Sequence, residues 1–371
     1  NASGVGYLST AYLLGYAPMQ LWVGALTDRF GSRLILISSL FFCVLGSFIF
    51  AVTSDIYIAT VGRVVIGLGS AFAFVAVLRL ASIWLEKKYF SFFVGLATAL
   101  AMIGAMLGDI EMSRLVAHAG WRHVIYLSAY MGCLLIPLFI CFVHEKDSGL
   151  SDSQNRSRGI LVSLRAVWLK KQLWFCGLIG CSLFLSLSVF ADIWGISFIE
   201  VRLHTSVITA SHINTSVYLG WLVGAPLFGW LSEYLQSRRL MLIWGALLSA
   251  FTFLFALFMP IYNIHVFSFL MFLFGFFASV EILCFALARD QVAIEYTASA
   301  LGFVNFLIML GGMILLAAVS KCLDMFFDGV TAQGLRVYSE HSYVMALIII
   351  PVLLIVGACL AYFVEDGVSD E

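Results

Sequence analysis

Several ionisable residues lie inside long apolar stretches of this chain, among them Arg63, Asp109, Asp192 and Glu281. A charge inside a lipid bilayer costs about 2.5–3.5 kcal/mol even on insertion scales, so such a residue normally faces a water-filled path or an opposite charge. A guanidinium in this position can bind an anionic group, and a carboxyl can take up and release a proton. These residues therefore predict substrate binding or proton movement within a membrane.

Arg63 and Asp109 both lie in the outer third of their stretches, so they could form a pair. A pair that breaks in another conformation would couple proton release to that conformational change. Glu281 lies deeper, and Asp192 is close enough to the outer end to be wet. Plainer alternatives stay open: Arg63 could extend to the outer surface, Asp109 could mark an outer loop, and Glu281 could be a neutral core acid.

A second group of candidates is polar and uncharged. Tyr12, Tyr16 and Gln20 share one face of a helix because they are four residues apart. Asn305 precedes a glycine pair at 311–312 in another apolar stretch. These residues could line a polar cavity, although helix packing is the commoner role for tyrosines at this spacing.

The composition identifies the elements that position these residues. Apolar residues make up 62% of the chain and charged residues 11%, with a mean hydropathy of +1.03. A soluble domain is nearer half apolar and a quarter charged, so lipid must be the solvent here. A helix needs about 20 apolar residues to cross the hydrocarbon. Eleven such runs are present, at 4–25, 34–53, 57–80, 90–112, 123–143, 172–198, 207–230, 240–260, 264–288, 298–320 and 341–363. They predict an all-α polytopic membrane protein and exclude a spanning barrel, whose strands alternate.

Two similar loops divide the chain. GALTDRFGSRL occupies residues 24–34, and GWLSEYLQSRR occupies residues 229–239. Their offset predicts two related halves, 1–143 and 172–371, joined by a link at 144–171 that contains an amphipathic helix at 160–168. The run at 172–198 has no counterpart before the first loop, so we expect one further helix upstream and twelve spans. An eleven-span protein with its amino terminus outside is the alternative.

Basic residues indicate the orientation. They concentrate in both similar loops, in the 144–171 link and at 87–88, all on one side of an alternating topology. The positive-inside rule places these loops in the cytoplasm.

The first loop resembles the loop signature of the major facilitator superfamily of transporters. The matching residues are Gly24, Leu26, Thr27, Asp28, Arg29, Gly31 and Arg33, while Ser32 replaces a basic residue. The resemblance implies that the acid holds one conformation through cytoplasmic contacts. In this chain we expect Asp28 to face the N-terminal end of the run near Ser299 and to pair with Arg79. The weaker second copy supplies Gly229, Glu233 and Arg238. The alternative is that these charges only set the topology.

Two further segments bear on the branch of the family. GRVVIGLGSAF, from Gly62, resembles the family's second signature through Arg63 and Gly67, but Ile66 replaces its glutamine. The run at 90–112 has a glycine spacing like that of drug/proton antiporters, but Asp109 stands where that signature has proline. The departure at Asp109 favours solute uptake or exchange over drug efflux, and Arg63 favours a substrate carboxylate.

The resemblance implies a secondary transporter that works by alternating access. We predict a small organic solute as substrate (an organic acid, amino acid or short peptide), protons as the coupling ion, and the lipid bilayer as surroundings. We expect a monomer in a plasma (bacterial inner) membrane, with no cofactor, metal, nucleic acid or enzymatic reaction. No GxxxxGK[ST] loop is present, so ATP is not the expected energy source. A drug/proton efflux antiporter and a transporter-like sensor remain alternatives.

Overall fold

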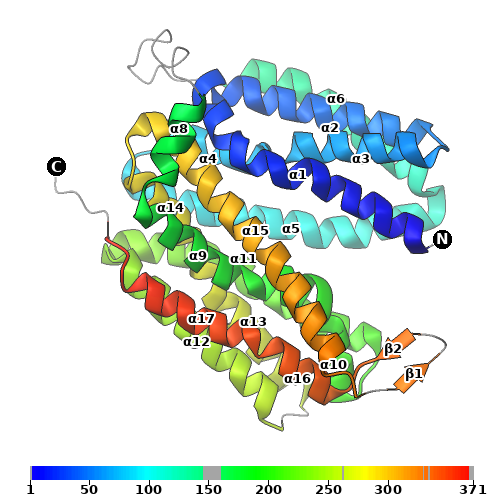
Figure 1. Cartoon of the computed structure of the whole chain (residues 1–371). Helices are drawn as coiled ribbons and strands as arrows, with labels where there is room; N and C mark the ends of the chain where they lie inside the picture. The colour runs from blue at the N-terminus through cyan, green and yellow to red at the C-terminus, as the bar shows by residue number, and fades with distance from the viewer. Residues whose placement is uncertain (1, 145–159, 261–262, 329, 333–334, 367–371) are drawn as a thin grey trace. The chain divides into compact units, whose positions relative to one another are not determined.

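The computed structural model describes residues 2–144, 160–260, 263–328, 330–332 and 335–366 (Figure 1). The described chain is helical apart from one short hairpin, which confirms the predicted fold class. The sequence did not predict the hairpin, whose strands β1 and β2 pair antiparallel with Val330 opposite Val337.

The helices follow the apolar runs. In the first part of the chain they are α1 (Ala2–Phe30), α2 (Ser32–Val52), α3 (Ile56–Ser70), α4 (Ala73–Trp84), α5 (Lys87–Ala119), α6 (Trp121–Phe142) and α8 (Ile160–Trp168). The remaining elements are α9 (Lys171–Leu185), the π-helix η1 (Ser186–Trp194), α10 (Gly195–Leu203), α11 (Val207–Leu235), α12 (Arg238–Phe258), α13 (Ile264–Ala278), the 3₁₀ turn η2 (Ser279–Glu281), α14 (Ile282–Asp290), the 3₁₀ turn η3 (Ile294–Tyr296), α15 (Thr297–Met325), β1 (Val330–Ala332), β2 (Leu335–Val337), α16 (Glu340–Leu347) and α17 (Ile349–Ala361). Helix α8 covers the residues predicted for the amphipathic helix of the link.

Within the described residues, eight helical stretches are long and apolar enough to cross a membrane. They are Ser32–Val52, Ile56–Trp84, Trp121–Phe142, Lys171–Leu203, Arg238–Phe258, Ile264–Asp290, Ile294–Met325 and Glu340–Ala361. The other three predicted runs lie in the long helices α1, α5 and α11. The total number of spans therefore stays a prediction, whereas the multi-pass helical character is confirmed.

The chain forms two compact units, and each takes a short segment from the opposite predicted half. Unit 1 comprises Asn1–Lys87, Gly104–Leu173 and Gln291–Phe306; unit 2 comprises Lys88–Ile103, Trp174–Asp290 and Leu307–Glu371. In unit 1, α3 packs against α1 and α2, and α6 packs against α2. In unit 2, α13 packs against α11 and α12, and α12 packs against α17. The packing of unit 2 includes a cluster of buried rings, in which Phe253 stacks on Phe274 at 4.4 Å and meets Phe190 edge-on at 5.0 Å.

Five of the eight spanning stretches in the described residues are not single α-helices. Ile294–Met325 begins with η3, and a turn at Ile348 separates α16 from α17. Three further breaks lie inside their stretches. In unit 1 a turn at Ala71–Phe72 separates α3 from α4, although the sequence predicted one run there. In unit 2 the π-helix η1 interrupts the stretch Lys171–Leu203, and η2 interrupts Ile264–Asp290. Such interruptions free backbone groups and often occur at functional sites. All three lie next to polar residues.

Candidate functional site

A cluster of polar side chains lies inside the spanning part of unit 1. It comes from three elements: α1 contributes three residues, α3 two and α15 one. We call these residues the intramembrane cluster: Tyr12, Tyr16, Gln20, Arg63, Ser70 and Asn305. Five of the six are residues that the sequence singled out, and the fold brings them together within one unit.

Tyr12 is the centre of the first part of this cluster. Its hydroxyl shares a hydrogen bond of 2.9 Å with Ser70 Oγ, at the end of α3. Its ring stacks on the Tyr16 ring at 5.7 Å, and the Arg63 guanidinium lies 5.5 Å from its centroid. Arg63 also lies 5.6 Å from the Phe50 ring. Cation–π contacts of this kind hold a guanidinium within a span while its N–H donors remain directed at other groups.

Two carboxamides form the second part of the cluster. Asn305 Nδ2 donates to Gln20 Oε1 at 2.6 Å, and both residues are buried. Gln20 Nε2 donates to the carbonyl of Ala71 at 3.5 Å, in the turn between α3 and α4. The Asn305 side chain also lies within hydrogen-bonding reach of the Tyr16 hydroxyl. The cluster therefore offers a guanidinium, hydroxyls and amides, which suit a carboxylate or hydroxyl-bearing solute.

Asp28 lies near the C-terminal end of α1, beyond the predicted apolar run at 4–25. Its carboxylate accepts hydrogen bonds from the backbone N–H groups of Ala298 (3.1 Å) and Ser299 (2.8 Å) and from Ser299 Oγ (2.6 Å). Arg79 Nε lies 3.4 Å away, with both side chains about 5% exposed. Burial raises the pKa of Asp28 to about 6, although Arg79 and the three donors act in the opposite direction. The geometry is the one expected from the sequence, and its gating role stays a prediction.

The other residues of the first signature have roles in turn geometry and helix packing. Gly31 links α1 to α2 with φ 82° and ψ 151°, a conformation that only glycine adopts easily. A Cβ on Gly24 would lie 2.2 Å from the carbonyl oxygen of Ala298, so α1 and α15 touch there. Leu26 packs on the apolar core of this unit, and Arg33 donates to the carbonyl of Ile140 at the end of α6 (2.7 Å). Arg29 contacts the ring of its neighbour Phe30 at 5.3 Å.

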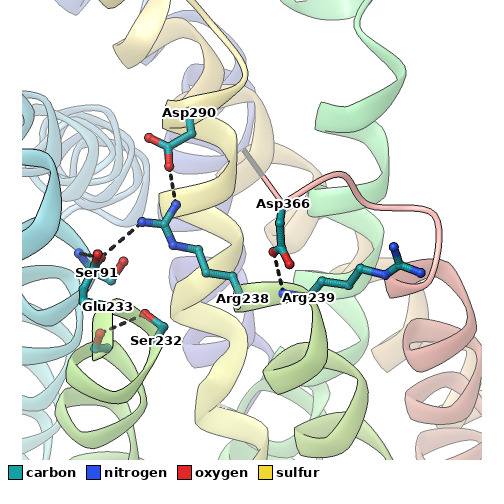
Figure 2. Close-up of polar contacts among 8 residues, drawn as sticks. Ser91, Ser232, Glu233, Arg238, Arg239, Asp290 and Asp366 are labelled. Atoms are coloured by element: carbon teal, nitrogen blue, oxygen red, sulfur yellow. Dashed lines mark hydrogen bonds and ion pairs between the residues drawn. The ribbon is translucent and has the colours of Figure 1, made fainter. Parts of the chain in front are cut away.

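The second signature forms a network of its own in unit 2. Figure 2 shows the Arg238 guanidinium extended between Asp290 and Glu233, with the Glu233 contact at 3.1 Å. Glu233 also accepts the backbone N–H of Ser91, near the N-terminal end of α5, at 3.4 Å. A Cβ on Gly229 would lie 2.5 Å from the Ser91 carbonyl oxygen. In each unit, therefore, a signature acid lies at the start of a helix from the other predicted half.

The sequence missed two members of this region. Asp290 ends α14 beside Arg238, and its position directly after an apolar run was the available signal. Asp366, in the segment after α17, accepts the backbone N–H of Arg239 at 2.8 Å (Figure 2) and so caps the start of α12. The Arg239 guanidinium lies 4.5 Å from the Tyr362 ring. Only the fold brings this segment to α12.

Asp192 lies exposed in the π-helix η1 of unit 2. The Tyr218 hydroxyl donates to Asp192 Oδ1 at 2.5 Å, and Asn214 Nδ2 donates to the carbonyl of Ala191 at 2.8 Å. Trp221 Nε1 donates to Ser186 Oγ at 3.0 Å. These three donors recur at four- and three-residue spacing along α11, so one face of α11 binds the π-helix.

Two remaining candidates are placed differently. Glu281 is 5% exposed in η2, within the described part of unit 2. Asp109 lies in helix α5, but the structure does not describe its side chain. The pairing of Asp109 with Arg63 therefore stays a prediction. Among the residues described, no group of three His, Cys, Asp or Glu side chains could hold a metal ion.

The chain matches the sequence model described as Major Facilitator Superfamily over residues 1–316 and again over residues 193–370. Among curated proteins, it is 32% identical over 143 residues to the multidrug resistance protein Stp of Mycobacterium tuberculosis, which covers 38% of this chain and 27% of Stp. It is 27% identical over 164 residues to the probable galactarate/D-glucarate transporter GarP of Escherichia coli, which covers 39% of this chain and 34% of GarP. The chain thus spans between about a quarter and a third of the length of these relatives.

The fold resembles that of a solved transporter over nearly the whole chain. A crystal structure of the Escherichia coli fucose:proton symporter FucP superposes with a TM-score of 0.78 and 16% sequence identity, covering 98% of this chain and 91% of that one. A structure of FucP in the outward conformation gives a TM-score of 0.77, also at 16% identity, covering 97% of this chain and 90% of that one. At this identity the likeness concerns the fold.

Proposed function

Because the chain belongs to the Major Facilitator Superfamily and is a multi-pass membrane transporter, we propose that it carries a small organic solute with a carboxylate group, coupled to protons. The substrate would be an organic acid, an amino acid or a short peptide. The observation that carries this proposal is Arg63, a guanidinium within the span Ile56–Trp84 that lies over the Tyr12 ring in the intramembrane cluster. An ionisable group at such a depth is a functional residue by default.

The donors around Arg63 favour this class of solute. A guanidinium binds a carboxylate with two parallel hydrogen bonds, and the Tyr12 and Tyr16 hydroxyls and the two amides can bind further oxygens. One relative is named as a probable galactarate/D-glucarate transporter and another, from Cupriavidus necator, as a probable sulfoacetate transporter. Both names describe acids, which supports an anionic substrate for this chain.

Glu281 and Asp192 are the proposed proton-carrying residues of unit 2, and Asp109 is a third candidate. Each is a carboxyl within a predicted span, and η2 and η1 give the first two an irregular backbone around them. Asp28 and Glu233 are the proposed gating residues. Their contacts with the starts of α15 and α5 would keep the cytoplasmic side closed in one state. In the other state these contacts would be broken.

The proposal is tested by transport in liposomes that contain the purified protein. A mixture of amino acids, dipeptides and small organic acids is offered with and without an inward proton gradient, and accumulated solutes are identified by mass spectrometry. We expect gradient-dependent accumulation of a carboxylate. Arg63→Ala should abolish it, whereas Arg165→Ala, which removes an exposed arginine of α8, should not. Unchanged coupled transport by Arg63→Ala would contradict the assignment.

Efflux of an apolar drug by proton exchange is the second candidate. The names of two relatives favour it: Stp, and the methylenomycin A resistance protein of Bacillus subtilis, which is 32% identical over 133 residues. Under this alternative no carboxylate accumulates, and a proton gradient expels a hydrophobic dye from inverted membrane vesicles.

A further inference from the structure

The Gln20–Asn305 amide pair joins two helices that belong to opposite predicted halves of the chain. Gln20 comes from α1 and is 0% exposed, and Asn305 comes from α15 and is 3% exposed. Their hydrogen bond of 2.6 Å lies within the apolar run of each helix. Water is scarce at that depth, so separating the helices would leave both amides to find new partners.

The pair is one step of a continuous contact between α1 and α15. Gln20, Gly24 and Asp28 recur every four residues and so share a face of α1. A Cβ on Gly302 would lie 2.9 Å from the backbone nitrogen of Gly24, so α15 also approaches α1 closely between the amide pair and the Asp28–Ser299 contact. The two helices are therefore joined by a charged contact at Asp28 and, within the apolar runs, by the uncharged Gln20–Asn305 hydrogen bond.

The Gln20–Asn305 amide pair also adjoins the proposed binding site. Asn305 lies within reach of the Tyr16 hydroxyl, and Tyr16 stacks on Tyr12, over which Arg63 lies. Gln20 reaches the turn between α3 and α4 through the carbonyl of Ala71. A solute oxygen that binds Tyr16 or Asn305 would compete for hydrogen bonds that now support the amide pair.

We propose that Gln20 and Asn305 are positioning residues: they form a latch within the membrane that holds α15 against α1 and that substrate in the Arg63 site loosens. The coupling to substrate rests on the proposed function, whereas the latch itself does not. An interhelical hydrogen bond in a membrane changes an equilibrium by about 3-fold to 20-fold, which is large enough to bias two conformations.

The latch is tested with a buried thiol reporter. Ala298→Cys places a cysteine at the start of α15, where the native residue is 0% exposed. Its alkylation by N-ethylmaleimide in liposomes is followed by peptide mass spectrometry, so the native cysteines serve as internal references. We expect Gln20→Leu and Asn305→Leu each to accelerate alkylation about 3-fold to 20-fold. Because both remove the same bond, the double variant should accelerate it less than the product of the two.

Two further variants separate the latch from a general loss of packing. Exchanging the amides (Gln20→Asn with Asn305→Gln) keeps the combined length of the pair and should restore slow alkylation. Ser39→Ala removes a buried hydrogen bond between α2 and α3, from Ser39 Oγ to the Gly69 carbonyl (2.7 Å), and should leave the reporter unchanged. Independent effects of the two leucine variants, or equal acceleration by Ser39→Ala, would overturn the latch.

The coupling to the site is tested with D-glucarate as the probe. In the reporter protein it should accelerate alkylation, and in Tyr16→Phe and Asn305→Leu this acceleration should be absent. Acceleration that persists in Asn305→Leu overturns the coupling while leaving the proposed function intact. Binding of D-glucarate is measured separately as a thermal shift of the protein, which Arg63→Ala should remove. If there is no such shift, the proposed substrate class fails for this probe, and the coupling to it fails too. The rates without ligand then still decide the latch.

Discussion

The Asp28 contact permits the sharpest prediction about gating. Asp28→Ala removes three hydrogen-bond acceptor contacts of 2.6–3.1 Å and the carboxylate beside Arg79. If these contacts hold the start of α15 against α1, the variant should shift the conformational equilibrium toward the separated state.

The magnitude follows from burial. Arg79 is 4% exposed, and removing one partner of a buried pair typically costs about 3–5 kcal/mol. Water replaces the lost partners once the helices separate, and Arg79 retains other contacts, so we take about 2 kcal/mol as the lower bound. That free energy corresponds to a shift of about 30-fold in the equilibrium.

The assay is alkylation of the Ala298→Cys reporter in liposomes. Asp28→Ala should accelerate it by about 30-fold or more, and Asp28→Asn should have a smaller effect because the amide keeps one acceptor oxygen. Adding Arg79→Leu to Asp28→Ala should recover part of the loss, because no guanidinium then remains buried beside the vacated position. An alkylation rate unchanged in Asp28→Ala would refute the reasoning, since it would mean that the contact carries no conformational energy.

Three other predictions concern titration and helix ends. The contact state holds the pKa of Asp28 at about 6 against an ordinary 3.8, so it binds more protons between these values. Lowering the pH from 7 to 5 should therefore favour the contact and slow reporter alkylation about tenfold relative to an Asp28→Asn background; a rate ratio that rises instead would contradict the sign. Gly31→Ala should lower the free energy of unfolding by about 1–3 kcal/mol because of its φ of 82°, measured by denaturation in detergent. Gly104→Ala, with nothing within 4 Å of an added Cβ, is the matched control and should not destabilise. Asp366→Ala should cost about 1 kcal/mol by uncapping α12, and Asp366→Asn should cost little; equal losses in both would argue against capping.

The amide latch and the Asp28 contact differ in chemistry, and this difference has a functional consequence. Burial raises the pKa of the Asp28 carboxyl to about 6, whereas the amides of Gln20 and Asn305 do not titrate. If both contacts act as proposed, the contact between α1 and α15 has one part that responds to protons and one that responds to hydrogen-bonding solutes.

Much of the architecture was determined by the sequence alone. Long apolar runs must become helices in lipid because every backbone N–H and C=O group needs an internal partner. The signature loop predicted a contact between Asp28 and the start of α15, because a carboxylate is stabilised at the N-terminal end of a helix. Gly31 forms the one-residue junction between α1 and α2, where glycine's conformational freedom is needed. The charges inside the runs marked Arg63, Asp192 and Glu281, because burying them costs free energy wherever they lie.

Only the tertiary structure decided which polar groups meet. Asn305 stood out in the sequence as one amide in an apolar run, and nothing local indicated that Gln20, 285 residues away, would be its partner. The same holds for Tyr218 and Asp192, for Asp366 and the start of α12, and for Ser70 beneath Tyr12. Hydropathy specifies that a segment is buried, but helix rotation, close approach at glycines and breaks such as Ala71–Phe72 depend on packing between distant segments. Which polar groups pair therefore depends on the fold. Hydrogen-bond partners must lie within about 3 Å of each other in space, and their separation in the sequence does not indicate whether they do.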